Sequence, residues 1–208
     1  MTIKDITRPL GPSTPVWPGD VVVTLERTMS RAAGDLVNNH ALHTSVHAGT
    51  HIDSPKHLFD DAWSVEQVDL RHCIGEAIVV DVGDAPVIGV EELPHLAGVR
   101  RVLFKTCCSR LAVGQWPEGF PALTPEAAAA LVEAGVWLVG VDSPSVDAQD
   151  SEDLQAHKLL LTGDVMIVEN LWLADVEPGP YELIALPLRL TGADASPARA
   201  VLRTLDPE

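Results

Sequence analysis

Apolar residues occur along this chain in short runs that glycine, proline and polar residues interrupt, a pattern typical of a protein built mainly from strands. Several of the runs are rich in β-branched residues, which pack well on a pleated sheet. They predict strands over residues 3–8, 21–29, 74–82, 101–106, 136–141, 164–169, 181–190 and 198–204. Because the predicted strands outnumber the helices, we expect a sheet-rich mixed α/β fold, with residues 1–208 forming a single domain.

Helices are indicated at only a few places in the sequence. Thr124 can cap the start of an alanine-rich helix that Gly135 would end. A second helix is expected over residues 151–161, and a short one within residues 89–96. The first helix leads directly into an apolar strand, so these two elements predict a local α/β unit.

The charge of the chain excludes some classes of partner. Its 208 residues include 30 acidic and 14 basic side chains, a formal net charge of −16. Such a surface repels phosphate backbones and acidic membranes, so neither nucleic acid nor a membrane is an expected partner. No apolar run approaches the ~20 residues that a membrane-spanning helix needs, and the N-terminus lacks the basic and apolar regions of a secretory signal. A cytoplasmic location is therefore expected.

The three cysteines, Cys73, Cys107 and Cys108, do not predict a disulfide framework, because two of them are adjacent in the chain. We expect buried or half-buried thiols. A nucleophilic Cys108 is the alternative, although its sequence neighbours include nothing that marks a reactive thiolate.

The stretch His47-Ala-Gly-Thr-His-Ile-Asp-Ser-Pro-Lys-His57 places every metal-capable side chain on an odd-numbered position. Side chains alternate between the two faces of an extended segment. One strand or strand-like loop can therefore direct a single set into one cleft: His47, His51, Asp53 and His57. Helical spacing also fits the first two histidines, but glycine and proline within the stretch oppose a helix. A surface histidine cluster without a ligand is a further alternative, and four convergent groups favour a metal site.

Imidazole and carboxylate ligands together suit zinc, and also manganese or iron. Asp53 has two oxygen atoms and can bridge two ions, and a metal pair can polarise a carbonyl and generate hydroxide from water. The stretch alone cannot supply two ions and still leave an imidazole for proton transfer. His157 and Glu169 are candidates for the missing ligands. A surface histidine and a strand-end salt bridge remain the alternatives for these two residues.

Aromatic residues and one further histidine flank the stretch. The proline-rich segment 10–20 is a stiff loop that presents Trp17, either as a hydrophobic plug in the core or as a wall for a flat aromatic substrate. Phe59 and Trp63 follow the stretch and are expected to cover the cleft from the other side. His43 shares the odd numbering and has two interpretations, a support for a ligand or a solvated histidine.

Five ordered blocks resemble the cyclase family of metal-dependent hydrolases and, within it, the bacterial kynurenine formamidases. They span nearly the whole chain: Val16-Trp-Pro-Gly-Asp20, residues 47–57, Val141-Asp-Ser-Pro-Ser-Val-Asp147 with Ala156-His157, Val168-Glu-Asn-Leu171, and Tyr181 to Arg189 with Ser196-Pro-Ala-Arg-Ala-Val-Leu202. One departure is Ala48-Gly-Thr50, where kynurenine formamidases commonly have Thr-Gly-Ala. That version occurs in the broader family, which includes isatin hydrolases.

The resemblance implies a ligand set for two divalent metal ions, with zinc the usual metal and manganese the alternative. His47, His51 and Asp53 would bind the first ion. Asp53 and Glu169 would bridge to the second ion, whose ligands His157 would complete. It also implies a homodimer of cyclase-like subunits with a swivelling β/β/α architecture.

The activity that the resemblance implies is removal of the formyl group from N-formylkynurenine, a small aromatic amide. His57 would be the acid–base residue, and Trp17 would contact the aromatic ring of the substrate. Two alternatives stay open: a hydrolase of the same family that opens a cyclic amide or lactone, as isatin hydrolase does, and a metal-binding protein without catalytic activity.

Overall fold

Strands dominate the computed structural model, which describes residues 1–205. The strands are β1 (Ile3–Asp5), β2 (Thr24–Met29), β3 (Asn39–His43), β4 (His51–Asp53), β5 (Ile74–Asp81), β6 (Arg101–Lys105), β7 (Leu138–Val141), β8 (Met166–Glu169), β9 (Gly179–Pro187) and β10 (Ala195–Thr204). The α-helices are α1 (Leu70–Cys73), α2 (Pro125–Glu133) and α3 (Gln155–Thr162). Short 3-10 helices cover Arg31–Ala33, Pro55–His57, Val65–Gln67, Val90–Glu92 and Cys107–Arg110. The predicted sheet-rich mixed α/β fold is confirmed.

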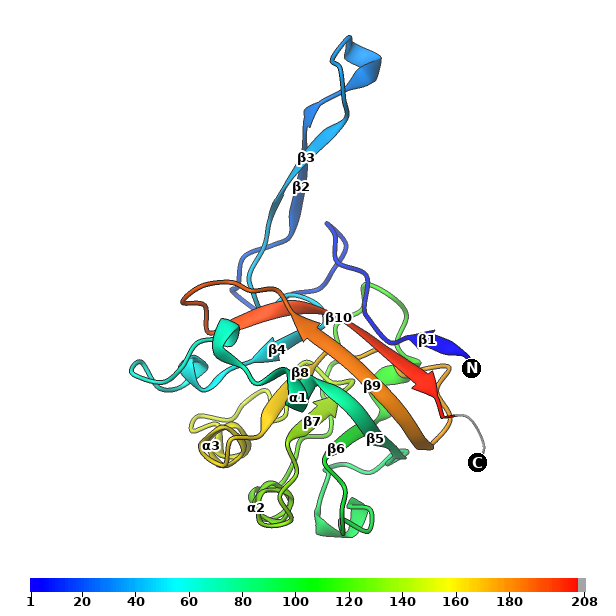
Figure 1. Ribbon diagram of the computed structural model, residues 1–208, viewed down its shortest axis with the longest axis vertical. Coiled ribbons are helices and arrows are strands. Elements are labelled where there is room, and N and C mark those ends of the chain that lie inside the picture. The colour runs from blue at the N-terminus through cyan, green and yellow to red at the C-terminus, as the bar shows by residue number, and fades with distance from the viewer. Residues whose placement is uncertain (206–208) are drawn as a thin grey trace.

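The main sheet closes on itself like a barrel. Its strand order is β1-β10-β4-β8-β7-β6-β5-β9, and β9 also pairs with β10. The four strands β5, β6, β7 and β8 run parallel, whereas β4, β9 and β10 pair in antiparallel fashion. Closure brings the early strand β4 between β10 and β8, so segments far apart in the sequence become neighbours (Figure 1).

The parallel strands are apolar on both faces because each face meets a separate core. In β6, Val102 and Phe104 join a cluster that includes Leu131 of α2 and Leu160 of α3, whereas Leu103 joins a cluster built with residues of β9 and β10. The helices α2 and α3 therefore cover the outside of the sheet (Figure 1). The cluster that contains Leu103 fills its inside.

Helix boundaries follow local signals at α2 and depart from them elsewhere. The Thr124 hydroxyl accepts a hydrogen bond from the Ala127 N–H at the start of α2, and Gly135 has a φ of 72° just beyond its end. The predicted helix over 151–161 begins only at Gln155, because Leu154 just before it has a left-handed backbone conformation with a φ of 49°. Residues 89–96 form a single 3-10 turn rather than a helix.

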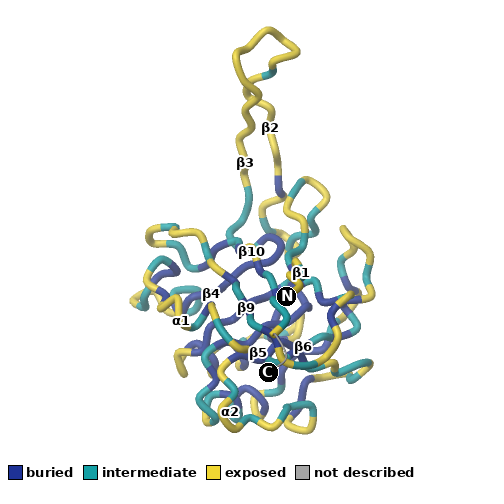
Figure 2. Tube along the Cα trace, turned by 45° about the vertical axis from the view of Figure 1, so that its right-hand side comes forward, coloured by how far each residue is buried: buried dark blue, intermediate teal, exposed yellow. Residues whose placement is uncertain are grey.

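A two-stranded arm, residues 24–43, projects from the body (Figures 1 and 2). Strands β2 and β3 form it, with Leu25 opposite Leu42. Every residue of the arm is exposed except Ser30, which is half-buried. The segment was expected to hold one strand and a polar connection, so β3 and the long hairpin are departures from the prediction. Among residues 1–205, no helix combines the length and apolarity that crossing a membrane requires.

Candidate metal centre

The predicted ligands come together where β4, β8 and α3 meet. Strand β4 lies antiparallel to β8, with His51 directly opposite Glu169. The loop after β7 leads into α3 and brings His157 to the same place, at the carboxyl end of the parallel strands. Parallel strands in α/β proteins, in open sheets and in barrels, commonly carry ligand sites at this end. His47 approaches from the turn that precedes β4.

Asp53 lies in the middle of the cluster, and its carboxylate is almost completely buried. Its Oδ1 atom is 3.1 Å from Nδ1 of His47 and 3.5 Å from Nε2 of His51. Its Oδ2 atom is 3.7 Å from Nε2 of His157. The Glu169 carboxylate lies opposite, with Oε2 3.4 Å from Nε2 of His51 and Oε1 3.3 Å from Nε2 of His157.

The hydrogen bonding of these atoms tests whether a metal fits. Both carboxylate oxygens of Asp53 and the Nε2 atom of His51 are buried without a hydrogen-bond partner. Buried polar groups are normally satisfied, and leaving one unpaired is costly. The ligand atoms form two groups small enough to surround an ion, and the groups share Asp53: His47, His51 and Asp53, and Asp53, His157 and Glu169. The donor set therefore fits a pair of divalent ions.

Hydrogen bonds behind the cluster orient its imidazoles. The Asp147 carboxylate lies 2.7 Å from Nδ1 of His157 and also accepts the backbone N–H groups of Ala156 and His157. The Gly49 carbonyl lies 2.8 Å from Nδ1 of His51. In both residues the Nε2 atom is left to face the carboxylates. Such contacts fix the ring orientation and the tautomer of metal-binding histidines.

The electrostatics of the cluster favour positive charge. Burial, the largest influence on His47, lowers its pKa, but the neighbouring carboxylates of Asp194 and Asp53 outweigh it and raise the pKa to about 10. Burial also acts to raise the pKa of Asp53, but the neighbouring histidines hold it well below its usual range. Burial opposes the charged form of His157 too, and the surrounding carboxylates raise its pKa well above the usual value. Concentrated carboxylates of this kind stabilise cations.

The backbone of residues 47–57 is less regular than the predicted extended segment. Only His51–Asp53 forms a strand, so among the predicted ligands the alternation rule holds for His51 and Asp53 alone. His47 lies in a turn before Gly49, whose φ of 66° favours glycine. His57 ends a 3-10 helix, Pro55–His57, rather than an extended segment. The residues between His47 and His51 are not helical, so the zinc-helix alternative is also wrong.

His57 lies beside the cluster and contacts a residue that sequence reasoning missed. Its Nδ1 atom is 3.2 Å from Oδ2 of Asp194, and the same oxygen is 2.8 Å from Nε2 of His47. Asp194 follows a glycine and an alanine in the turn before β10. A turn aspartate usually caps its own backbone, so no local pattern indicates this contact.

An aromatic-walled pocket of about 470 Å³ opens over the cluster. Trp17 and Trp116 line it with their rings 5.6 Å apart and nearly perpendicular. Trp17 is 38% exposed, which rules out a core plug. His57 lines the pocket beside the ligand cluster, and Gln149 lies near Trp116 with its Oε1 atom 3.4 Å from the indole nitrogen. No sequence signal distinguished Trp116 from other surface-loop aromatics.

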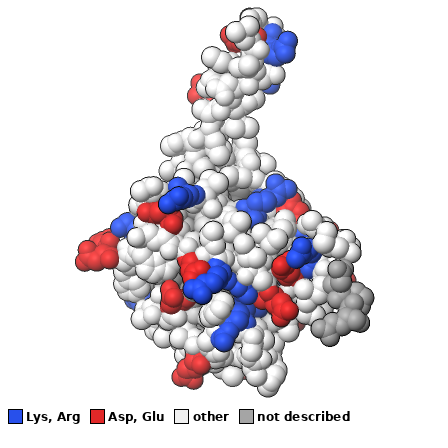
Figure 3. Space-filling view, in the orientation of Figure 1, with Lys and Arg blue, Asp and Glu red and all other residues white. Residues whose placement is uncertain are grey.

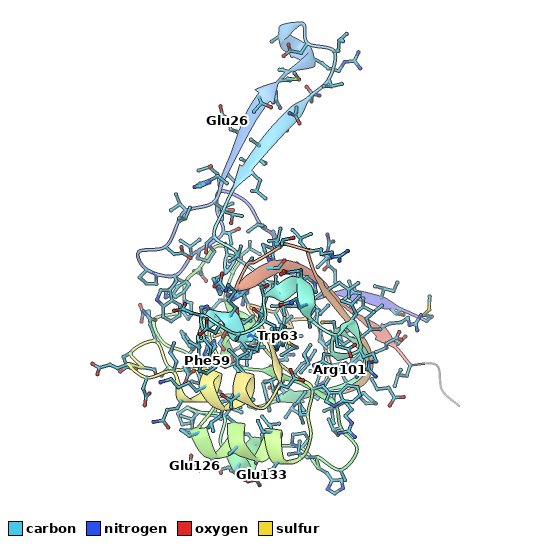
Figure 4. All side chains as sticks on the ribbon, turned by 60° about the vertical axis from the view of Figure 1, so that its left-hand side comes forward. Glu26, Phe59, Trp63, Arg101, Glu126 and Glu133 are labelled. Carbon is cyan, nitrogen blue, oxygen red and sulfur yellow. The ribbon has the colours of Figure 1, made fainter. Side chains whose placement is uncertain are left out.

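Several candidates lie away from the pocket. Trp63 packs against the inner core, and neither it nor Phe59 lines the pocket, so the prediction that they cover the cleft is wrong (Figure 4). His43 is exposed on the arm and supports no ligand. The cysteines are free, as predicted. Burial raises the pKa of Cys108 to about 12, so its thiol is a poor nucleophile at neutral pH.

Comparisons with known proteins find relatives and similar structures over nearly the whole chain. The model of the family described as "Putative cyclase" matches residues 4–148. The kynurenine formamidase of Salinibacter ruber is 44% identical over 207 residues, which cover 98% of this chain and 98% of that protein. A structure described as a predicted metal-dependent hydrolase from Bacillus stearothermophilus is 29% identical, with a TM-score of 0.83 and 97% of each chain covered. Isatin hydrolase A from Ralstonia solanacearum is 25% identical, with a TM-score of 0.82, covering 97% of this chain and 91% of that one.

Proposed function

Because this chain belongs to the cyclase family of metal-dependent hydrolases, we propose that it removes the formyl group from N-formylkynurenine, giving kynurenine and formate. The observation that carries the proposal is the position of the unpartnered Asp53 carboxylate, which lies among histidines beneath an aromatic-walled pocket. The near full-length similarity to a kynurenine formamidase supports the choice of a linear formyl amide as substrate. We take residues 1–208 as one catalytic domain.

We propose that two divalent ions, zinc in the first instance and manganese as the alternative, occupy the two ligand groups. His47, His51 and Asp53 would hold one ion. Asp53 and Glu169 would bridge to the other, with His157 as its further ligand. When bound, such ions polarise a carbonyl oxygen and lower the pKa of bound water, which is the chemistry that amide hydrolysis needs.

The chain's own residues position the substrate and move protons. The Trp17 and Trp116 rings form an apolar wall against which an aniline ring can lie. His57 faces the same pocket and is not a member of the two proposed ligand groups. In the proposed reaction, its imidazole accepts a proton from the attacking water and returns one to the departing aniline nitrogen as the carbon–nitrogen bond breaks. A histidine suits this exchange near neutral pH.

Two alternatives differ from this function in testable ways. A cyclic amide such as isatin would use the same centre, and similarity to isatin hydrolase A supports keeping it as a comparison substrate. A structural metal site would be closed to solvent and would hold no surplus imidazole. The open pocket and the position of His57 favour catalysis over that second alternative.

We also propose that the protein is a homodimer and that the arm, residues 24–43, binds a second copy. A two-stranded hairpin is at best marginally stable in water without further contacts. The arm nevertheless exposes several large apolar side chains: Leu25, Met29, Leu36, Val37 and Leu42.

The charges of the two acidic and two basic residues of the arm cancel, so the net charge of −16 belongs to the rest of the chain. Most of the arm surface is uncharged, whereas charged groups are spread over the body (Figure 3). A neutral apolar arm can therefore contact a second acidic body without charge repulsion.

The proposed activity is tested by comparing turnover of N-formylkynurenine and isatin by the zinc-loaded protein, alongside a His57→Ala variant. We expect faster turnover of N-formylkynurenine. The substitution should reduce kcat by about 10²- to 10⁴-fold while the bound metal, measured by elemental analysis, stays unchanged. Preferential turnover of isatin would reassign the substrate, and no turnover of either compound or of simple esters would favour the non-catalytic alternative. Near-normal kcat in His57→Ala would remove this residue from the mechanism.

A further inference from the structure

We propose that Asp194 is a positioning residue that aligns His57 for proton transfer and His47 for metal binding. The first of these roles rests on the proposed function, whereas the second concerns only the metal centre. One carboxylate oxygen of Asp194 contacts two imidazoles that have different proposed roles.

The contact is a fork centred on Oδ2 of Asp194. This atom lies 2.8 Å from Nε2 of His47 and 3.2 Å from Nδ1 of His57. The two imidazole rings lie beside each other, with centroids 4.3 Å apart and planes inclined by 44°. The carboxylate therefore accepts from both rings at once.

The backbone fixes this carboxylate relative to the centre. The N–H and the hydroxyl of Ser54 both donate to the Asp194 carbonyl, at 2.9 and 2.8 Å. The Val65 N–H donates to the carbonyl of Ala193 at 2.9 Å. Ala195, the first residue of β10, pairs with Asp53 in β4. The turn that carries Asp194 is thus tied to the segment that leads from Asp53 to His57.

This arrangement selects the nitrogen that each histidine offers. A carboxylate at Nδ1 of His57 favours the tautomer protonated there and leaves Nε2, which bonds to no residue in the described part of the chain, free to exchange protons with a substrate. At His47 the carboxylate holds Nε2 and leaves Nδ1, 3.1 Å from Asp53, on the side of the metal group. A carboxylate–histidine–metal series of this kind raises the basicity of the ligand.

Direct metal binding by Asp194 is the competing interpretation, because its carboxylate, His47 and His57 also lie close enough to surround an ion. The burial pattern opposes it. The Asp194 side chain is 39% exposed and its Oδ2 atom already contacts both imidazoles, whereas the buried atoms of the ligand cluster that lack partners belong to Asp53 and His51. A cation would therefore bind on the Nδ1 side of His47, whereas Asp194 contacts the Nε2 atom of the same ring.

The test combines Asp194→Ala with His57→Ala in a double-mutant cycle at saturating Zn²⁺, with the exposed Asp61→Ala as a matched control. Asp194→Ala should lower kcat by roughly ten- to 1000-fold, with KM changed by less than about threefold. In the His57→Ala background the same substitution should cause no further loss of kcat, because the residue acts through His57. Asp194→Glu should restore part of the rate. Equal losses in both backgrounds, or unchanged kcat, would overturn the catalytic part.

Two further measurements need no substrate. Competition with a chelator should show that Asp194→Ala weakens Zn²⁺ binding about 10- to 100-fold without changing the number of ions bound. Loss of one ion per chain would instead make Asp194 a ligand. Nitrogen-15 NMR reports the tautomer of each imidazole, and the His57 signals are identified by their absence from the spectrum of His57→Ala. In the unchanged protein, His57 should be protonated at Nδ1. In Asp194→Ala, His57 should be a mixture of the two tautomers. If these results hold while the protein fails to hydrolyse N-formylkynurenine, the proposed function is wrong and the positioning role stands. An unchanged tautomer would refute that role.

Discussion

At the scale of single residues, Asp53 carries the strongest functional signal. A carboxylate that is 1% exposed and has no hydrogen bond to either oxygen is costly in a protein interior. Surrounding imidazoles offset that cost only in part, because each lies at 3.1 to 3.7 Å in a geometry that closes no hydrogen bond to the carboxylate. Divalent cations between these atoms would satisfy all of them at once.

Asp53→Asn should therefore weaken metal binding more than the same substitution of an exposed aspartate. We expect the amide, which lacks the negative charge and cannot bridge two ions, to reduce the metal content by at least one ion per chain and kcat/KM by about 100-fold or more. Elemental analysis and kinetics provide the measurements, with Asp61→Asn as the control. Full metal occupancy in Asp53→Asn would contradict the bridging role.

Asp147 is expected to act on both the centre and a helix. Its carboxylate accepts two backbone N–H groups at the start of α3 and also orients His157. Asp147→Ala should weaken zinc binding about 10- to 100-fold and lower the free energy of unfolding of the metal-free protein by roughly 1 kcal/mol. Chelator competition and urea denaturation measure the two effects. A change in stability without a change in metal affinity would limit Asp147 to capping the helix.

At the scale of elements, close packing of the parallel strands holds the centre in place. Gly140 in β7 lies between Leu103 of β6 and Leu171 just beyond β8. A Cβ atom there would come within 2.4 Å of Leu103 and 2.8 Å of Leu171. Glycine is thus required at position 140 because a Cβ atom would have no room, and not because the backbone turns there.

Gly140→Ala should destabilise the fold by about 1–3 kcal/mol, because the two leucines must shift in a close-packed core. Urea denaturation of the zinc-loaded protein measures the change. A matched substitution at Gly119, where a Cβ atom meets nothing within 4 Å, should have a much smaller effect. Equal stability of the two variants would show that the core accommodates the extra methyl group.

The arm is the second element with a testable consequence. Glu26, in strand β2 of the arm, lies well away from the body of the protein (Figure 4). Replacing residues 24–43 by an Asn-Gly turn should convert the proposed dimer into a monomer, because the exposed apolar surface would be removed. Light scattering after size-exclusion chromatography measures the mass. A milder variant, Leu25→Asp with Leu42→Asp, places like charges opposite each other and should weaken the dimer. A full-length monomer, or a dimer that survives the deletion, would contradict the proposal.

At the scale of the whole molecule, the candidate metal centre links the two halves of the chain. The candidate ligands of β4 come from the first third of the sequence, and those of α3 and β8 come from the last third. Bound ions would therefore stabilise the closed sheet and not only the site, because the ligand geometry exists only in the folded protein.

Removal of metal by EDTA should consequently lower the melting temperature. For zinc at about 1,000 times its Kd the linkage is about 4 kcal/mol, which corresponds to a shift on the order of 10 °C for a chain of this size. Differential scanning calorimetry measures the shift, and re-addition of zinc should reverse it. In Asp53→Asn the difference between zinc-loaded and EDTA-treated protein should shrink. An unchanged melting temperature would show that the ions contribute nothing to global stability.

The sequence by itself determined the α/β alternation from β6 to β8, because apolar runs and helix signals such as Thr124 and Gly135 act over a few neighbouring residues. It also supplied the motif that contains His51 and Asp53, since ligand types and their spacing are local properties. The ordered blocks that resemble one family extended this to the substrate and to the candidate ligands His157 and Glu169.

Only the tertiary structure decided which distant residues meet. The pairing of β4 with β8 and the closure of β9 on β10 depend on the packing of the whole chain, and periodicity shows that a face is buried without showing what covers it. Asp194, Trp116 and the arm were therefore missed, because each gains its importance from a contact or an exposure that the neighbouring sequence does not encode. The local sequence pattern determines the secondary structure and the side-chain chemistry of each segment. The long-range packing determines which of these side chains come into contact.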